Sequence, residues 1–167
     1  MSVLGIRRFP DHILKQPTRP IERINAEARR LIDAMIRTMR HHPHCVGLAA
    51  PQVGSRLRIA VMDASHHPKS KGSCGLLVLV NPTIEIAEGT QIQREGCLSV
   101  PDFTGNVRRA TRIKISAQDQ FGSTSSRWLD GFDAIVAQHE IDHLNGQLFL
   151  DRLENPATDL FRRKTYL

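Results

Sequence analysis

Apolar residues recur at every third or fourth position between residues 21 and 40, which predicts an amphipathic helix. The apolar positions are Ile21, Ile24, Ala28, Leu31, Ile32, Met35, Ile36 and Met39. The helix should end at His41-His42-Pro43, because a proline disfavours helical geometry in the residue before it. The arginines of this segment fall outside the apolar stripe and indicate a solvated face.

Several short runs after this helix have the alternating, β-branched composition of strands. They cover residues 57–62, 76–80, 83–86 and 112–117. Asn81-Pro82 should close the second run, and turns are expected at residues 54–55, 66–72 and 120–123. The pattern is typical of half-buried antiparallel strands.

A second helix is predicted to begin after Leu129-Asp130-Gly131, with Asp130 as its cap, and to end at Asn145-Gly146. Two helices therefore bracket a mainly antiparallel region, and neither an internal repeat nor a linker divides the 167 residues. We expect one domain over residues 1–167 with an α+β fold. Mainly antiparallel sheets should pack around the C-terminal helix, with the N-terminal helix as a further element.

The composition limits the partners that the chain can have. The net charge is +6, but the basic residues are scattered in short pairs without interleaved aromatic residues, which favours a solvated surface over a base-stacking one. No segment is apolar enough for a signal peptide or a membrane span. We therefore expect a cytoplasmic protein without a membrane partner or a sequence-specific nucleic acid partner.

Three cysteines are present, Cys45, Cys74 and Cys97. They cannot all pair, and they form no Cys-x-x-Cys motif. Disulfides are therefore not expected in this compartment, and each thiol is a candidate metal ligand.

The second predicted helix carries ionisable residues in its inward-facing stripe. At the helical spacing this stripe consists of Phe132, Ile135, Val136, His139, Glu140, His143 and Leu144. Burying two imidazoles and a carboxylate is unfavourable unless a partner such as a bound cation compensates for it. His139 and His143 are one turn apart and can reach one ion, while Glu140 can lie beside a metal-bound water as a general base. The segment predicts a metal-dependent hydrolase; the alternative is a surface helix in which the spacing arose by chance.

A catalytic site of this kind needs a third protein ligand. Phe149 stands where one class of metalloprotease has a third histidine, which excludes that arrangement. The downstream carboxylates lie in a short tail interrupted by Pro156. An upstream cysteine is therefore the expected ligand. Cys97 lies between Gly96 and Pro101 in a segment of unusual backbone, and Cys45 and Cys74 compete with it.

The stretch from Gly47 to Gly54 is small, apolar and contains one neutral amide, Gln52. Small residues allow another backbone to approach closely, and Gln52 offers both a hydrogen-bond donor and an acceptor without charge. The alternative is a tightly packed loop before a strand.

Two other functions also fit the helix pattern. A zinc endopeptidase or aminopeptidase shares it but lacks its third ligand here. A structural metal site would need a fourth ligand, from Cys45 or from a histidine among residues 41, 42 and 44.

Residues 47–52, 95–99 and 138–143 together resemble the three signature motifs of the peptide deformylases, in the same order. The resemblance extends from the N-terminal helix to Phe149-Leu150-Asp151. It implies a catalytic domain that removes the N-formyl group from the N-terminal methionine of newly made polypeptides and releases formate. The partners would be N-formylmethionyl nascent peptides.

The resemblance also implies the metal centre. It selects Cys97 as the third ligand beside His139 and His143, and it favours Fe²⁺ as the divalent ion, with Zn²⁺, Ni²⁺ or Co²⁺ also able to occupy the site in a purified sample. A metal-bound water would attack the formyl carbon with Glu140 as general base and then general acid.

Further roles follow from the same resemblance. The backbone N–H of Leu98 and the side-chain amide of Gln52 would hold the oxyanion. Val46 and Gly47 would run beside the substrate backbone, with Gly47 counted among the catalytic residues, and an apolar pocket would take the methionine.

Two features depart from the family pattern. Cys45 replaces the first glycine of the usual Gly-x-Gly-Leu-Ala-Ala, which puts the methionine pocket and the substrate preference in question. The tail from Glu154 to Leu167 is shorter than the helix that some bacterial members use at the ribosome. The ribosome surface, contacted through Arg162, Arg163 and Lys164, is a further predicted partner.

Overall fold

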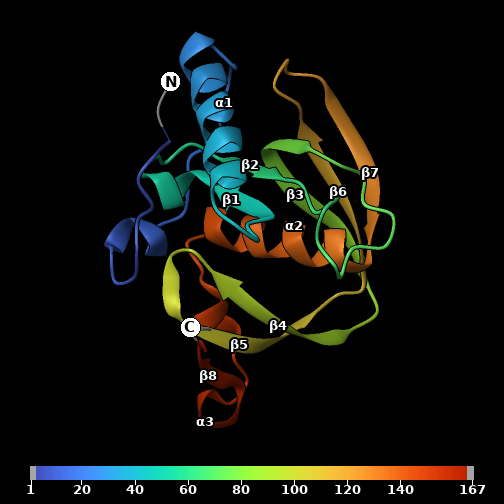
Figure 1. Ribbon diagram of the computed structural model, residues 1–167. Helices are drawn as coiled ribbons and strands as arrows, with labels where there is room; N and C mark the ends of the chain where they lie inside the picture. The colour runs from blue at the N-terminus through green and yellow to red at the C-terminus, as the bar shows by residue number, and fades with distance from the viewer. Residues whose placement is uncertain (1–2, 165–167) are drawn as a thin grey trace.

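The computed structural model describes residues 3–164 and contains two sheets and two long helices (Figure 1). The α-helices are α1 (Ala26–His41), α2 (Gly131–Leu144) and the short α3 (Pro156–Asp159). The strands are β1 (Gly47–Ala49), β2 (Ile59–Met62), β3 (Leu77–Glu88), β4 (Gln91–Cys97), β5 (Val100–Arg109), β6 (Arg112–Gln118), β7 (Thr124–Asp130) and β8 (Leu160–Arg162). Three 3-10 helices cover His12–Lys15, Ala50–Val53 and Phe149–Arg152. The predicted α+β class with antiparallel sheets is confirmed.

The larger sheet has five strands in the order β1-β2-β3-β6-β7, and the smaller has three in the order β4-β5-β8. Every pair of neighbouring strands is antiparallel. Strand β1 pairs only with β2 and is therefore an edge strand. The β4 to β5 connection is a tight hairpin in which Cys97 pairs with Val100.

Strand β2 lies between the two long helices and is buried along its whole length. Its side chains alternate between two cores, as the period of a strand requires. Ile59 and Val61 pack with the apolar face of α1, whereas Ala60 and Met62 pack with α2. The sheet is therefore covered by a helix on each face.

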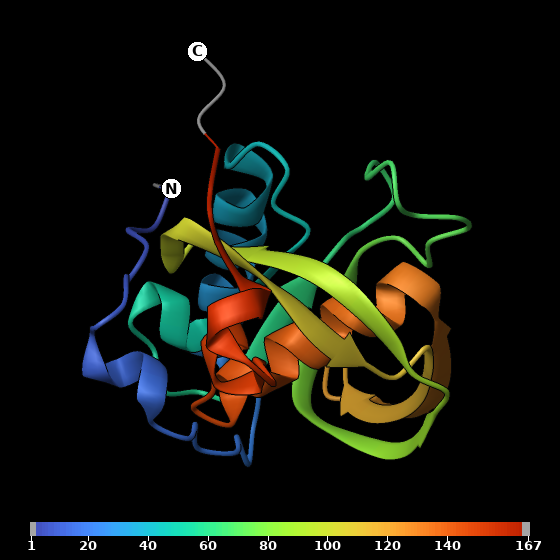
Figure 2. The ribbon, with the colours of Figure 1, turned by 90° about the horizontal axis from the view of Figure 1, so that it is seen from below.

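Helix α2 is also covered on its other side, by the smaller sheet. Figure 2 shows β4 and β5 crossing over α2 on the side away from α1. A third core cluster forms there, with Cys97, Val107 and Phe149 among its members. Because it lies between two sheets, α2 has no continuous wet face, and even Asp133 and Asp142 are buried.

Helix α1 begins five residues later than the apolar periodicity indicated. The Asn25 side chain accepts a hydrogen bond from the backbone N–H of Ala28 and caps the helix there. Ile21 and Ile24 still pack on the same core, but from an irregular segment. The prediction was wrong because their apolar spacing is satisfied without helical backbone.

A further local prediction was wrong, and another was confirmed only in position. Asn81-Pro82 does not end a strand: β3 continues through it with a register shift, and Asn81 adopts a positive φ of 51°. Asp130 occupies the N-cap position of α2, as predicted, but its side chain makes no capping hydrogen bond. It lies near Arg112, with an Nε to Oδ1 distance of 3.1 Å. The predicted helix end holds, with Asn145 as C-cap and Gly146 at φ 75°.

Strands β1, β4, β5, β7 and β8 were not predicted. Strands β4, β5 and β8 make up the whole of the smaller sheet, and β1 and β7 are the two edges of the larger one. No helix within residues 3–164 is long and apolar enough to cross a membrane.

Candidate metal centre and active site

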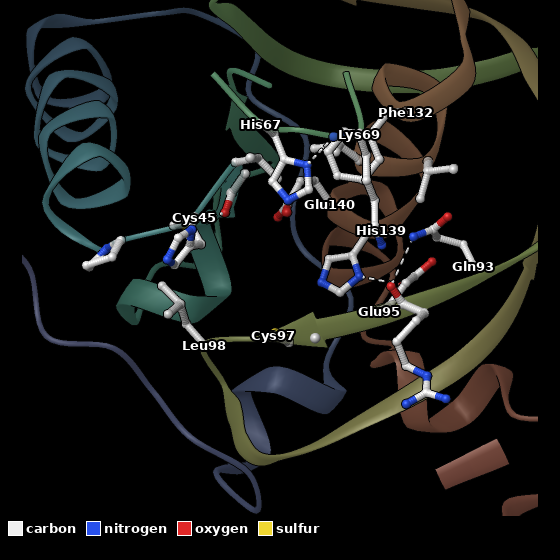
Figure 3. Close-up of a pocket in the computed structure, with 18 of the residues that line it drawn as sticks. Cys45, His67, Lys69, Gln93, Glu95, Cys97, Leu98, Phe132, His139 and Glu140 are labelled. Carbon is white, nitrogen blue, oxygen red and sulfur yellow. Dashed lines mark hydrogen bonds and ion pairs between the residues drawn. The ribbon is translucent and has the colours of Figure 1, made fainter. Parts of the chain in front are cut away.

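Three potential metal ligands converge between α2 and the end of β4. The ligand atoms of Cys97, His139 and His143 all lie within 4.8 Å of one another, and the Cys97 Sγ is 3.3 Å from His143 Nε2. The two histidines project from one helix face, as their spacing of four residues predicted. Figure 3 shows His139 next to the strand that ends at Cys97.

His139 is oriented by a carboxylate behind it. Its Nδ1 lies 2.8 Å from Glu95 Oε2 (Figure 3), which leaves Nε2 for the centre of the cluster. Hydrogen bonds of this kind fix the tautomer and the direction of a ligating imidazole. Glu95 is therefore placed to orient His139.

A buried ionic network holds Glu95 in turn. The Arg109 guanidinium donates to both Glu95 oxygens, at 2.7 and 2.9 Å, and to Asp142 at 2.6 Å. The side chains of Arg109, Glu95 and Asp142 are only 3%, 5% and 6% exposed. Although burial opposes it, bonding to Arg109 and His139 lowers the pKa of Glu95 to about 2. The network ties β4 and β5 to α2 behind the ligands.

The donor set fits a divalent cation. A thiol and two imidazoles that are packed together suit Zn²⁺ or Fe²⁺. Burial alone would raise the pKa of Cys97, but the charge of His143 and hydrogen bonds from both histidines lower it well below its usual value. A thiolate is the form that ligates metals. In addition, Glu140 Oε2 is buried and has no hydrogen-bond partner among the described residues.

Glu140 lies next to the ligands and against β1. Its side chain is packed so closely on Gly47 that a Cβ at this position would collide with Oε1 and lie 2.8 Å from Cδ. Burial raises the pKa of Glu140 to about 7, although the two histidines oppose the shift. A carboxyl group in this state can accept and return a proton near neutral pH.

Gln52 points its amide nitrogen toward Cys97. Its Oε1 accepts from the backbone N–H of Ala49 at 2.9 Å, which fixes the orientation of the side chain. The Nε2 then lies 3.4 Å from Cys97 Sγ and 3.2 Å from Ser99 Oγ. The motif around Gln52 is therefore not merely a packed loop, since it brings a donor to the candidate site.

A cavity of about 210 Å³ opens onto these groups. Its apolar lining comes from Val46, Leu98, Phe132, Ile135 and Val136. Figure 3 shows Phe132 and His67 on one side of this space and Leu98 on the other. The His67 ring stacks on Phe132, with centroids 4.4 Å apart.

The other candidate ligands do not join the cluster. Cys74 is exposed and bonds to Asp133, with an Sγ to Oδ2 distance of 3.0 Å. Cys45 lines the cavity, but its Sγ is 3.1 Å from the carbonyl oxygen of Gly47. Among residues 3–164 the cluster holds three ligands, without Cys45 or a histidine of residues 41–44. This leaves a position open for a small molecule, which a closed structural site lacks.

Sequence reasoning missed the ionic network and several cavity residues. Arg109 lies at the end of a strand that was not predicted, and its partners are 14 and 33 positions away in the chain. Lys69 and Arg163 reach the cavity only through the folding of a loop and of the C-terminal strand. No local pattern in the sequence could have placed them there.

Comparison with known proteins identifies the family. The model of the polypeptide deformylase family matches residues 3–159. A peptide deformylase from Thermodesulfovibrio yellowstonii is 40% identical over 164 residues, covering 98% of this chain and 97% of that protein. The crystal structure of the peptide deformylase from Thermotoga maritima superposes with a TM-score of 0.84 at 36% identity, covering 93% and 100% of the two chains.

A further solved structure, a peptide deformylase from Acinetobacter baumannii with Met-Ala-Ser bound, has a TM-score of 0.84 at 34% identity and covers 91% and 99% of the two chains. Family model, sequence and fold agree over nearly the whole length. The chain belongs to the polypeptide deformylase family of enzymes.

Proposed function

We propose that the protein hydrolyses the formyl amide of N-formylmethionyl peptides and releases formate. The observation that supports this most strongly is the arrangement of a buried carboxylate, Glu140, beside three converging ligands at the end of a cavity. Newly made polypeptides are the expected substrates, and the cytoplasm, where they are made, is the expected location.

Cys97, His139 and His143 would hold one divalent ion. When bound, the ion would act as a Lewis acid and lower the pKa of a water molecule at the site. The resemblance to the deformylases favours Fe²⁺, while thiolate and imidazole ligands also accept Zn²⁺, Ni²⁺ or Co²⁺.

Glu140 would act as general base and then general acid. It would take the proton of the attacking water and pass it to the nitrogen of the leaving peptide. Its burial supports this role, because a pKa of about 7 lets the carboxyl group both accept and release a proton near neutral pH. Gly47 contributes by leaving room for the carboxylate against β1.

Two donors would stabilise the oxyanion that forms on the formyl group. Leu98 is the first central residue of the hairpin between Cys97 and Val100, where the backbone N–H is not used in strand pairing. Gln52 would supply its Nε2, which lies toward Cys97. Preorganised donors of this kind stabilise charge that develops in the transition state.

The substrate backbone would lie along the free edge of β1, beside Val46 and Gly47. The Val46 carbonyl bonds to the N–H of Asp63, so the alternation of the strand turns the carbonyl of Gly47 away from β2. An extended peptide can add to such an edge. The apolar cavity lining beside it would take the methionine side chain, consistent with the Met-Ala-Ser bound by the related Acinetobacter baumannii enzyme.

Formate release from a formyl-methionyl peptide tests the proposal. Anaerobically purified protein should release formate from this peptide but leave an unformylated peptide of the same sequence intact. Cleavage of internal peptide bonds would instead support an endopeptidase. A protein that has bound its metal and leaves both peptides unchanged would contradict the proposal.

Ribosome association remains a prediction. Arg162 ends β8, Arg163 and Lys164 follow it, and the last three residues of the tail lie outside the described residues. Co-sedimentation with ribosomes that persists after deletion of residues 159–167 would contradict a docking role for this tail.

A further inference from the structure

The outer part of the active-site cavity carries basic side chains from three separate segments. Lys69 comes from the loop between β2 and β3, Arg94 from β4, and Arg163 from the residue after β8. We call these three exposed residues the basic rim. Among the ion pairs formed within residues 3–164, none involves a member of the basic rim. The rim therefore presents uncompensated positive charge to a molecule in the cavity.

The carboxylates that line the same cavity do not neutralise the rim. Within the part of the chain that the structure describes, Glu95 and Glu140 are the only carboxylates that line this cavity, and both are buried. Glu95 is bonded to Arg109 and His139, and Glu140 lies at the metal ligands. A peptide leaving the cavity would thus meet negative charge only at the bottom and positive charge at the exit.

The smaller sheet fixes the position of Arg163 through a backbone hydrogen bond and a side-chain contact. Its backbone N–H donates to the carbonyl of Asp102 at 2.8 Å and extends the pairing of β8 with β5. Its guanidinium lies against Gly96, where a Cβ would collide with Nη2. The side chain therefore crosses β5 and covers the residue next to Cys97. Strand β8 also organises Arg94, whose guanidinium stacks on Phe161 at 3.5 Å from the ring centroid.

A second hollow continues from the cavity past Leu98. The two share Cys97, Leu98 and Arg163, and the second is also lined by the N-terminal segment and by Arg8. Within residues 3–164 no carboxylate lines it. A peptide that follows this path would pass Arg163 first and Arg8 afterwards.

We propose that the basic rim makes the enzyme prefer formylated peptides that carry a carboxylate side chain a few residues after the methionine, with Arg163 as the main contact. This inference rests on the proposed deformylase function. Arginine binds a carboxylate through two parallel N–H donors, and Arg163 is held at its backbone, so less freedom is lost on binding. The occupant is the substrate itself, because the basic rim surrounds the exit from the site where its formyl group would react.

The test compares pairs of short formyl-methionyl peptides with amidated C-termini. Within each pair a single Glu, placed at the second, third, fourth or fifth residue, is replaced by Gln. At low ionic strength kcat/KM for the Glu peptide should exceed that for the Gln peptide by about two- to fivefold at one position at least, the range expected for a near-surface ion pair. The ratio should fall toward unity in about 0.5 M NaCl, because salt screens such pairs.

Variants locate the effect. Arg163→Gln should bring the ratio close to one, and Arg163→Glu should invert it in favour of the Gln peptide. Arg162→Gln is the matched control: Arg162 is the exposed last residue of β8, directly before Arg163, but it does not line the cavity, so both ratio and activity should persist. Circular dichroism and metal content show whether each variant is folded.

Equal kcat/KM for Glu and Gln peptides at every position in the wild type would overturn the proposal, and so would a ratio that survives Arg163→Gln. Failure of the deformylase function gives a different result, because formate would then be released from neither member of a pair.

Discussion

Replacing Arg109 by Met tests whether the buried ionic network holds the smaller sheet to α2. Methionine keeps an unbranched apolar stem but removes the charge and three hydrogen bonds at 2.6 to 2.9 Å. Glu95 would then keep only its hydrogen bond with His139, whereas Asp142 would keep the hydrogen bond that it accepts from Arg152 at 2.6 Å. Removing one partner of a buried ionic group typically costs about 3 to 5 kcal/mol, because an uncompensated charge remains. We expect the free energy of unfolding of Arg109→Met to fall by an amount in this range.

The assay is urea unfolding of metal-free protein followed by far-ultraviolet circular dichroism, since a bound metal would add its own stabilisation. Arg108→Met is the control: Arg108 is the adjacent residue of β5, but its side chain is exposed and pairs with exposed Glu154. This variant should unfold at nearly the same urea concentration as the wild type. Adding Glu95→Gln to Arg109→Met should restore part of the loss, because it removes the carboxylate that lost its partner.

If the free energy of unfolding of Arg109→Met lies within about 1 kcal/mol of the wild-type value, the network does not hold the smaller sheet to α2, because that is only the contribution of an exposed ion pair. The same holds if Arg108→Met is equally destabilising.

Three other predictions follow from the site. Because the pKa of Glu95 is lowered from 4.5 to about 2, its contribution to stability is present above pH 4.5 and is lost as the pH falls toward 2. When the free energy of unfolding is measured by urea titration between these two pH values, the wild type should lose about 3 kcal/mol more than Glu95→Gln. The prediction is wrong if the free energies of both proteins fall in parallel with pH. Gly47→Ala should lower kcat about a hundredfold with metal content unchanged, because its Cβ displaces the Glu140 carboxylate; an unaltered kcat argues against that contact. Cys45→Gly should raise kcat/KM about two- to fivefold, because the thiol no longer occupies the Gly47 carbonyl that the substrate backbone would use; a lower kcat/KM would show that the thiol assists binding.

The features that the sequence predicted well are local. His139 and His143 project together because residues four apart share a helix face, and this holds whatever surrounds the helix. The end of α2 just before Gly146 was predictable for a similar reason, because glycine readily adopts the positive φ that follows a helix end. Fold class could be inferred because helices and alternating strands occupy separate parts of the chain.

What could not be predicted depends on strand register and on distant pairing. Nothing in the residues alone distinguishes Cys97 from Cys74 as a ligand; the difference is that the hairpin of β4 and β5 carries Cys97 to α2. Arg109 meets Glu95 and Asp142 only because β5 is paired with β4 and packed against that helix. Ile21 and Ile24 misled the prediction of α1 for the same reason, since tertiary packing satisfied an apolar spacing without a helix.

Glu140→Gln tests whether Glu140 transfers the proton in formyl hydrolysis at the site formed by Cys97, His139 and His143. Formate release from a formyl-methionyl peptide should be measured anaerobically for wild type and variant at equal metal content. The variant should bind metal normally, and its kcat should fall by a factor of about 10² to 10⁴, the usual contribution of a general base. A metal-loaded Glu140→Gln enzyme that releases formate at the wild-type rate would contradict this role of Glu140.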